Sequence, residues 1–305
     1  MKPSWRAVDG VLLLDKPGGC TSNQALQRVR RLYQAAKAGH TGSLDPLATG
    51  LLPICLGEAT KISGYLLDAD KHYAVRAKLG ERTSTADCEG ELTAQSDAAA
   101  VQRADLEILL PRFTGPQKQV PPMVSALKHE GERLYVLARR GETVHREPRD
   151  IIIHELRLTG FELPYFELDV RCSKGTYIRS LVEDLAAAIG QVAHVTVLRR
   201  LGLAPFNQPE MLTWERLEQV ATTGLAALDA LLLPPAAALA HRACVHVDGE
   251  QARRLAQGQA VRLAQPVSGE VAALDAFGTL LGIGVGDKEG KLAPRRWLAQ
   301  APKTL

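Results

Sequence analysis

A single acidic side chain stands in the loop HTGSLDPLATG, which runs from His40 to Gly50. This side chain is Asp45, and Pro46 after it biases the Asp45 backbone away from the helical region toward an extended or turn conformation. A carboxylate fixed on a constrained loop can act as a base, a nucleophile or a stabilising charge. It can also simply close a turn, which is the ordinary role of Asp before Pro.

Other polar side chains lie in segments that are otherwise apolar. Tyr73 stands in the strand-like segment KHYAVRAKLG, and Arg179 follows CSKG by one turn of a helical segment. Lys16 and His40 add titratable groups at the front of the chain. Each has a structural alternative: Tyr73 as a core aromatic with its hydroxyl tethered, and Arg179 as a surface cation paired with Glu183 four residues on.

Familiar cofactor and metal motifs are not supported. The stretch GIGVGDKEG (Gly282–Gly290) looks like a nucleotide-binding loop, but no apolar helix follows it, so we interpret its glycines as turn residues. His241, Cys244 and His246 lack a clear fourth ligand for a metal ion. We therefore predict no cofactor-binding residues and no metal site.

Composition limits the class of protein. The chain has 305 residues, 46% of them hydrophobic and 23% charged, and a formal net charge of +3, which permits a polyanionic partner without requiring one. Its five cysteines are an odd number without a Cys-x-x-Cys pair, which favours a reducing compartment. There is no apolar leader and no apolar run long enough for a membrane span. We expect a cytoplasmic protein that does not enter a membrane.

Hydrophobic periodicity indicates mixed secondary structure. Strands are predicted for residues 10–17, 71–80, 149–162 and 165–175, and helices for residues 21–33, 103–114, 176–190 and 213–232. A Pro- and Ala-rich stretch, Leu232–Ala243, reads as a linker, and short strand-like runs follow it. The pattern predicts an α+β domain over residues 1–240 and a small β-rich domain over residues 241–305.

Six segments between about Gly10 and Gly202 resemble, in order, the TruB family of pseudouridine synthases: GVLLLDKPGGCTSN, AGHTGSLDPLATGLLPICLGEATK, DKHYAVRAKLG, VPPMVSALKHEGERLYVLARRG, RCSKGTYIRSLVEDL and HVTVLRRLGL. The tail GIGVGDKEGKLAPRRWL is similar to the PUA-like domain that ends bacterial members. Val124 departs from the family, which commonly has an aromatic residue there. The resemblance implies a mixed-sheet catalytic domain followed by a PUA-like RNA-binding domain.

The resemblance also implies a reaction. Enzymes of this family isomerise the uridine at position 55 in the T loop of tRNA by flipping the base out, cleaving its glycosidic bond, rotating the uracil and rejoining it through C5. No atoms are gained or lost, so no cofactor is expected. Asp45 matches the essential aspartate of the family. It could attack C1′ of the ribose, add to C6 of the base or remove the C2′ proton, and the sequence leaves these routes open.

The resemblance assigns two catalytic partners to this aspartate. Arg179 matches the arginine that pairs with it, and such a cation keeps a partly buried carboxylate ionised and fixes its direction. Tyr73 matches the aromatic residue that stacks on the flipped base, with a hydroxyl that can help proton transfer from C5.

Four further residues match substrate-binding positions. Tyr177 and Leu198 match residues that line the uracil pocket. His40 matches the residue that fills the space left by the flipped base, whose extrusion costs a few kcal/mol of stacking. Lys16, with Pro17 after it, resembles a motif that supports the active-site loop.

Basic residues recur along the chain in a way that suits an RNA partner: Arg28, Arg30, Arg31, Lys37, Arg139, Arg140, Arg199, Arg200, Arg295 and Arg296. We expect tRNA, through its T stem-loop, to be the partner of a monomer that needs no protein partner. An RNA-binding protein that mainly assists tRNA folding is the alternative class. A guided synthase acting on ribosomal RNA is a third interpretation, and the lack of a lysine-rich tail speaks against it.

Overall fold

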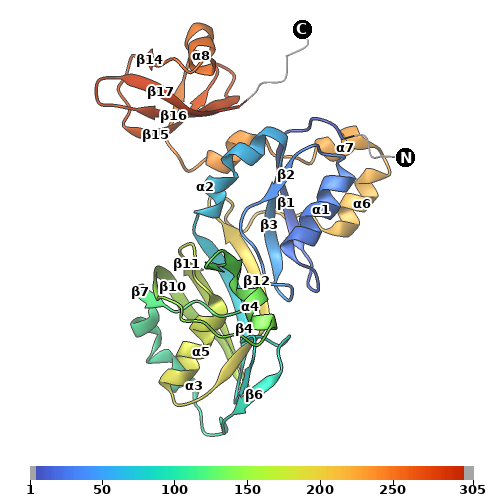
Figure 1. Cartoon of the computed structure of the whole chain (residues 1–305), viewed down its shortest axis with the longest axis vertical. Coiled ribbons are helices and arrows are strands. Elements are labelled where there is room, and N and C mark those ends of the chain that lie inside the picture. The colour runs from blue at the N-terminus through green and yellow to red at the C-terminus, as the bar shows by residue number, and fades with distance from the viewer. Residues whose placement is uncertain (1–4, 299–305) are drawn as a thin grey trace.

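Strand pairing organises the chain around two main sheets, seen in a computed structural model that describes residues 5–298 (Figure 1). The larger sheet has eight strands, in which β12 pairs with β3 in parallel and the other pairs are antiparallel. Its order is β1 (Gly10–Lys16), β3 (Thr49–Leu56), β12 (Ala193–Leu203), β4 (Lys71–Leu79), β11 (Tyr165–Cys172), β10 (Arg149–Glu162) and β7 (Gly115–Gln119), with β2 (Ala38–His40) also on β3. The prediction of a mixed-sheet α+β fold is confirmed.

Helices cover the large sheet in two groups (Figure 1). α1 (Ser22–Leu32), α6 (Trp214–Ala221) and α7 (Leu225–Asp229) lie beside β1 and β3, whereas α5 (Ile178–Ala188) and α3 (Arg103–Glu107) lie beside the strands around β4. The remaining short helices are η1 (Gly57–Ile62), α2 (Ser63–Leu67), η2 (Leu110–Phe113), α4 (Leu134–Arg139) and η3 (Pro235–Leu239). Two small hairpins complete this part: β5 (Glu81–Thr83) with β6 (Leu92–Gln95), and β8 (Lys128–His129) with β9 (Glu132–Arg133).

Local sequence explains where the helices begin and stop. Thr21 caps α1: its hydroxyl accepts from the Gln24 amide, and the Gln24 side chain accepts from the Thr21 amide. The single helix predicted for residues 103–114 is instead two short pieces separated near Pro111. The helix predicted for residues 213–232 is likewise interrupted, at Gly224, where the backbone has a φ of +110°.

The Pro- and Ala-rich segment is not the loose linker that composition predicts. Leu233 pairs through its backbone with Val11 of β1. η3 follows at once, with Ala238 and Leu239 buried in a cluster that also contains Val11. This segment therefore belongs to the packed body of the protein.

The second sheet forms a small β-rich unit at the end of the chain, as predicted. Its order is β13 (Cys244–His246), β15 (Gly269–Leu274), β16 (Leu280–Gly286), β17 (Lys291–Trp297) and β14 (Val261–Arg262), and α8 (Gly249–Ala256) packs on it. The glycines of GIGVG are strand residues rather than the turn residues expected. A Cβ at Gly282 would come within 2.5 Å of the Arg296 carbonyl oxygen, so close strand packing explains them.

The small unit is docked on the segment between β3 and β4. The Lys61 ammonium donates to the Trp297 carbonyl at 3.1 Å, and the Arg296 guanidinium donates to the Lys61 carbonyl at 2.6 Å. One apolar cluster contains residues of both units, such as Leu51 and Ile283. No helix within residues 5–298 is both long and apolar enough to cross a membrane.

Gly50, at the start of β3, provides a test of this packing. Its φ is +97°, and a Cβ there would lie 2.3 Å from the backbone oxygen of Arg200 on β12. Gly19 also has a positive φ, +76°, but open space around it. We expect Gly19→Ala to lower the free energy of unfolding by about 1 kcal/mol through backbone strain alone, and Gly50→Ala to lower it by more than about 4 kcal/mol or to prevent folding. Urea unfolding measures both, and equal losses would contradict this account of the β3–β12 contact.

Candidate active site

The loop that carries Asp45 joins β2 to β3 and is tied down on the α1 side. The Leu44 amide donates to the Ser22 hydroxyl at 2.8 Å, and that hydroxyl donates to the Leu44 carbonyl at 3.1 Å. The turn itself is closed by the backbone, because the Ala48 amide donates to the Asp45 carbonyl at 3.0 Å. Asp45 therefore does not serve as a side-chain turn cap, and its carboxylate is available for other contacts.

Lys16, at the end of β1, binds the same loop through its side chain. Its side chain is fully buried, and its ammonium donates to the carbonyl oxygens of Pro17 at 2.9 Å, Pro46 at 3.2 Å and Ala48 at 2.6 Å. An ammonium has three protons to donate, so all are used within the protein. These bonds tie the Lys16 ammonium to the loop and leave none of its protons for a substrate, so a supporting role for Lys16 stays the prediction.

The carboxylate of Asp45 meets the guanidinium of Arg179 in a two-point contact. Arg179 Nε lies 2.9 Å from Asp45 Oδ2, and Nη2 donates to Oδ1 at 3.1 Å. The Arg179 side chain is only 2% exposed, whereas the Asp45 side chain is 35% exposed. The cation is thus the buried partner and the acid is the more exposed one. The alternative pairing of Arg179 with Glu183 is wrong.

The other donors of Arg179 are also used. Nη1 donates to the Thr85 carbonyl at 2.7 Å, and Nη2 donates to the Val124 carbonyl at 2.8 Å. The second contact uses backbone, so the unusual residue type at position 124 does not affect it. These bonds hold the guanidinium plane in one orientation and thereby set the direction of the Asp45 carboxylate.

A second acid, Asp87, was not recognised in the sequence. It is 3% exposed, and its Oδ2 lies 3.8 Å from Arg179 Nη1. Its other oxygen accepts from the Thr85 hydroxyl at 2.6 Å and from the Glu89 amide at 3.1 Å. In the polar stretch TSTADCEGEL it looks like an ordinary turn residue, and no spacing rule connects it to Arg179.

The electrostatics of Asp45 reflect two opposing effects. Burial raises the pKa of the Asp45 carboxyl, and the negative charge of Asp87 adds to this effect. The charges of Arg179 and Lys16 and the hydrogen bond from Arg179 act in the opposite direction and limit the rise. The net pKa is raised, so the Asp45 carboxylate is a stronger base than a solvated aspartate.

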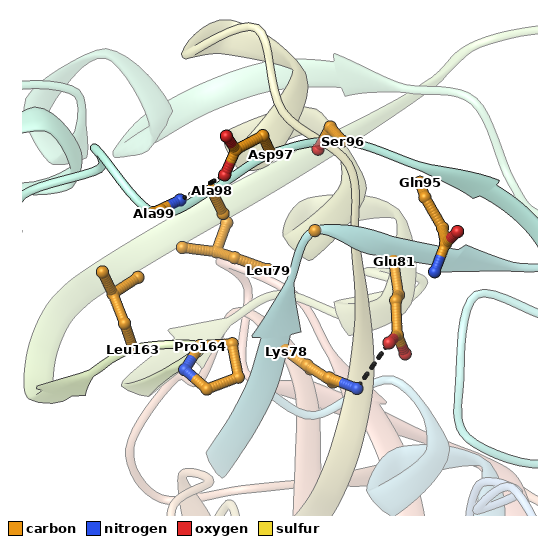
Figure 2. Close-up of a pocket in the computed structure, with 11 residues that line it drawn as sticks. Lys78, Leu79, Glu81, Gln95, Ser96, Asp97, Ala98, Ala99, Leu163 and Pro164 are labelled. Carbon is orange, nitrogen blue, oxygen red and sulfur yellow. Dashed lines mark hydrogen bonds and ion pairs between the residues drawn. The ribbon is translucent and has the colours of Figure 1, made fainter.

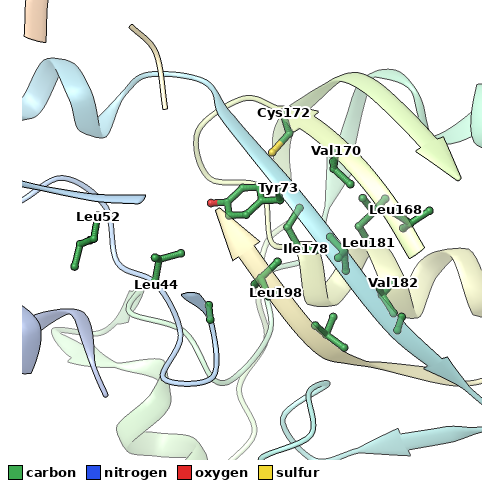
Figure 3. Close-up of a cluster of buried hydrophobic side chains, with 14 of the residues drawn as sticks. Leu44, Leu52, Tyr73, Leu168, Val170, Cys172, Ile178, Leu181, Val182 and Leu198 are labelled. Atoms are coloured by element: carbon green, nitrogen blue, oxygen red, sulfur yellow. The ribbon is translucent and has the colours of Figure 1, made fainter. Parts of the chain in front are cut away.

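Tyr73 lies on β4, and its ring is 8% exposed within the main apolar cluster. Figure 3 shows the ring near Leu198 and Cys172, with the hydroxyl pointing away from Leu181 and Val182 of α5. Burial raises the pKa of the Tyr73 phenol, and the nearby Asp45 charge contributes to the rise. The ring is therefore a packed residue whose polar end faces the side of the sheet that carries Asp45.

The two predicted pocket residues lie on neighbouring elements. Leu198 is 5% exposed on β12 and is paired with Val75 of β4. Tyr177 precedes α5, and its backbone is fixed by Gln119: the Tyr177 amide donates to Gln119 Oε1 at 2.8 Å, and Gln119 Nε2 donates to the Tyr177 carbonyl at 3.0 Å. Gln119 is a further supporting residue that the sequence gave no reason to select.

His40 ends β2, just before the catalytic loop. Its Nδ1 is buried without a hydrogen-bond partner among residues 5–298. Burial lowers the pKa of the imidazole, and the charge of Arg200 lowers it further, so His40 is neutral near pH 7. A neutral, half-buried ring with an unused nitrogen suits contact with an aromatic or polar base.

The basic pairs near the end of β12 and on β17 differ in how accessible their side chains are. Arg199 makes a two-point contact with Asp15, at 2.9 and 2.7 Å, and Arg200 is 1% exposed. Arg296 is committed to the Lys61 carbonyl, and Arg295 pairs closely with Glu270. Burial therefore excludes Arg200 from direct phosphate contact, whereas Arg199, Arg295 and Arg296 keep exposed surface, so their role on a phosphate-binding face stays a prediction.

One surface depression lies away from these residues (Figure 2). It measures about 640 Å³ and includes the Lys78–Glu81 ion pair of 2.6 Å and the hairpin residues Leu163 and Pro164. None of the candidate site residues lines it. In the described part of the chain, no group of three His, Cys, Asp or Glu side chains is placed to hold a metal ion. What the Asp45 region offers is an oriented carboxylate beside an aromatic ring.

Sequence comparisons match nearly the whole chain to one family. The model of the TruB family pseudouridylate synthase N-terminal domain matches residues 30–178, that of the tRNA pseudouridylate synthase B C-terminal domain residues 179–240, and that of the pseudouridine synthase II TruB C-terminal region residues 243–298. The protein named tRNA pseudouridine synthase B from Methylobacillus flagellatus is 51% identical over 97% of both chains. That of Pasteurella multocida is 48% identical, again over 97% of both chains.

Structural comparison supports the fold independently. The Cbf5 chain type found in a Cbf5–Nop10–Gar1 complex superposes with a TM-score of 0.74 at 23% identity, covering 98% of this chain and 90% of the other. A chain of an H/ACA RNP bound to a substrate RNA gives a TM-score of 0.72 at 20% identity, covering 96% and 86%. Both similarities concern the architecture of the chain, including its small terminal sheet.

Proposed function

This chain belongs to the TruB family of tRNA pseudouridine synthases, and we propose that Asp45 supplies the carboxylate with which it isomerises the uridine at position 55 in the T loop of tRNA. The observation that carries the proposal is the two-point contact of Asp45 with the buried Arg179. This contact leaves an oriented carboxylate as the more exposed member of the pair.

The reaction sets what the site must do. The C1′–N1 bond breaks and a C1′–C5 bond forms, and the proton on C5 is finally exchanged for one on N1, so the overall composition of the RNA does not change. Glycoside hydrolases typically need a second acid to protonate the leaving group. Here the uracil is retained and reused, so one carboxylate suffices and no cofactor is required.

Arg179 and Tyr73 give this carboxylate its setting. Arg179 keeps Asp45 ionised against the effect of burial and holds its oxygens in one direction. Tyr73 stacks on the extruded base, while Leu198 and Tyr177 bound the pocket so that the detached uracil rotates without escaping. His40 enters the space that the flipped base leaves in the T loop.

Exposed cations on the segments next to the site supply contacts to the tRNA phosphates in this proposal. The insertion between β7 and β10 reaches Arg179 through the Val124 carbonyl. Exposed cations on the same insertion, Lys128, Arg133 and Arg139, are placed to contact phosphates. We propose that the protein acts on tRNA in the cytoplasm, as a monomer without an obligate protein partner.

The alternative function, a guided synthase that acts on ribosomal RNA, has less support from the comparisons. The structural similarity to Cbf5 chains is a similarity of fold at 20–23% identity. The relatives at 48–51% identity over almost the full length are named tRNA pseudouridine synthase B. The proposed substrate is therefore tRNA.

Replacing Asp45 by Asn tests the role of the carboxylate. Asn keeps the size and the turn preference but removes the charge, so the variant should fold and bind tRNA. Pseudouridine formation at position 55 under single-turnover conditions should fall about 10⁴-fold or more, as for other essential catalytic groups. Thermal melting and tRNA affinity are the controls. Substantial turnover by a folded Asn variant would refute the assignment.

The pH dependence provides a second test. The reactive form of Asp45 is the ionised one, so the single-turnover rate should fall as pH decreases through the Asp45 pKa. Because burial raises this pKa above the ordinary value of 3.8, the acidic limb should lie at higher pH than for an exposed aspartate. Rates at saturating tRNA are measured at each pH alongside affinity and melting. A rate that stays flat down to about pH 4 while the protein remains folded would contradict the raised pKa.

A further inference from the structure

Arg200 is a buried cation that has no acidic partner in the described part of the chain. It is 1% exposed, and no Asp or Glu oxygen of residues 5–298 lies within 4.0 Å of its guanidinium. Its guanidinium bonds neutral groups: Nε donates to the Leu51 carbonyl at 2.7 Å, and Nη2 donates to the Gly42 carbonyl at 3.2 Å. A buried charge without a counter-charge is costly, so its retention calls for a reason beyond packing.

The neighbouring arginine shows the contrast. Arg199 points to the other face of β12, where Asp15 neutralises it in a two-point contact. The sequence does not distinguish these two adjacent arginines. In the structure Arg199 has an acidic partner, whereas Arg200 is buried without one.

Arg200 is placed where the catalytic elements meet. On β12 it is the cross-strand partner of Tyr73 on β4, so the two side chains lie on the same face of the sheet. Gly42 precedes Asp45 in the catalytic loop and Leu51 follows it, so the same guanidinium ties together both arms of that loop. One side chain thus lies beside the aromatic residue and binds the loop that the proposed function uses.

The positive charge of Arg200 affects the pKa values of neighbouring groups. It lowers the pKa of His40, whose main cause of lowering is burial. It also contributes, after burial, to lowering the pKa of Lys71 to about 8. His40, Lys71 and Tyr73 therefore all lie within reach of the Arg200 charge.

We propose that Arg200 is a positioning residue for the isomerisation, which ties both arms of the Asp45 loop beside Tyr73 and supplies a positive charge to the base pocket. The inference rests on the proposed function. In the routes that detach the base, the electron pair of the C1′–N1 bond stays on uracil N1 and spreads to O2 and O4. A fixed positive charge near the pocket stabilises this anion until the pair forms the C1′–C5 bond, and no further reactant is required.

A purely structural role makes a different prediction. The two carbonyl contacts could be made by any side chain with N–H donors, including a neutral one. If only these contacts matter, activity should follow thermal stability whatever the charge at position 200. If the charge matters, a cation should be better than a neutral donor at equal stability.

The experiment compares Arg200→Lys with Arg200→Gln, and uses Arg199→Lys as the control on the other face of the strand. At saturating tRNA we expect Arg200→Lys to reduce the single-turnover rate about 10-fold and Arg200→Gln at least about 100-fold, with tRNA affinity within about threefold of wild type. Arg199→Lys should stay within about threefold of wild type in both measurements. Equal rates for the Lys and Gln variants, or a wild-type rate for Arg200→Gln, would overturn the proposal.

Two further measurements keep the test decisive. Titration of Tyr73 by ¹³Cζ NMR should show a higher pKa in Arg200→Gln than in the wild type, because the guanidinium lowers it. Should the Arg200 variants fail to fold, Tyr73→Phe removes only the hydroxyl, and a wild-type rate for that variant would refute a role through it. All comparisons start from wild-type protein that forms pseudouridine at position 55, so a failure of the proposed function is recognised separately.

Discussion

The contact between Arg179 and Asp45 is the constraint around which the site is arranged. A carboxylate that is partly withdrawn from water resists ionisation, and the buried guanidinium counters that effect and fixes the direction of the two oxygens. Arg179 can do this because its remaining donors are bound to the Thr85 and Val124 carbonyls. Segments far apart in sequence are thereby joined at one side chain, and the acid is left as the exposed member of the pair.

The scaffold beneath this contact is built from backbone carbonyls that bind buried cations. Lys16 binds three carbonyls around the Asp45 loop, and Arg200 binds one on each arm of it. Gly50 allows β3 to approach β12 so closely that a side chain would collide with the backbone. A loop supported in this way can keep its shape while RNA binds and leaves, which is what positioning at the ångström scale requires.

Much of this could be predicted from sequence, and the rest fails for physical reasons. The apolar run of β1, the capped start of α1 and the loop of Asp45 have strong local signals, and the structure agrees with them. β12 was not predicted as a strand, because adjacent arginines and two bulges obscure its alternation. The role of Asp87 and the burial of Arg200 depend on which strands become neighbours, and no local pattern contains that information.

The most direct test of the central claim is a crystal structure of the Asp45→Asn protein bound to an RNA stem-loop that contains the T-loop uridine. We predict that the uridine is flipped out of the loop, stacked on Tyr73, with its ribose or base in contact with the side chain at position 45. We also predict that Arg179 still bonds that side chain from its buried side. A uridine that remains stacked in the loop, or one that is flipped into a different pocket away from position 45, would contradict the account.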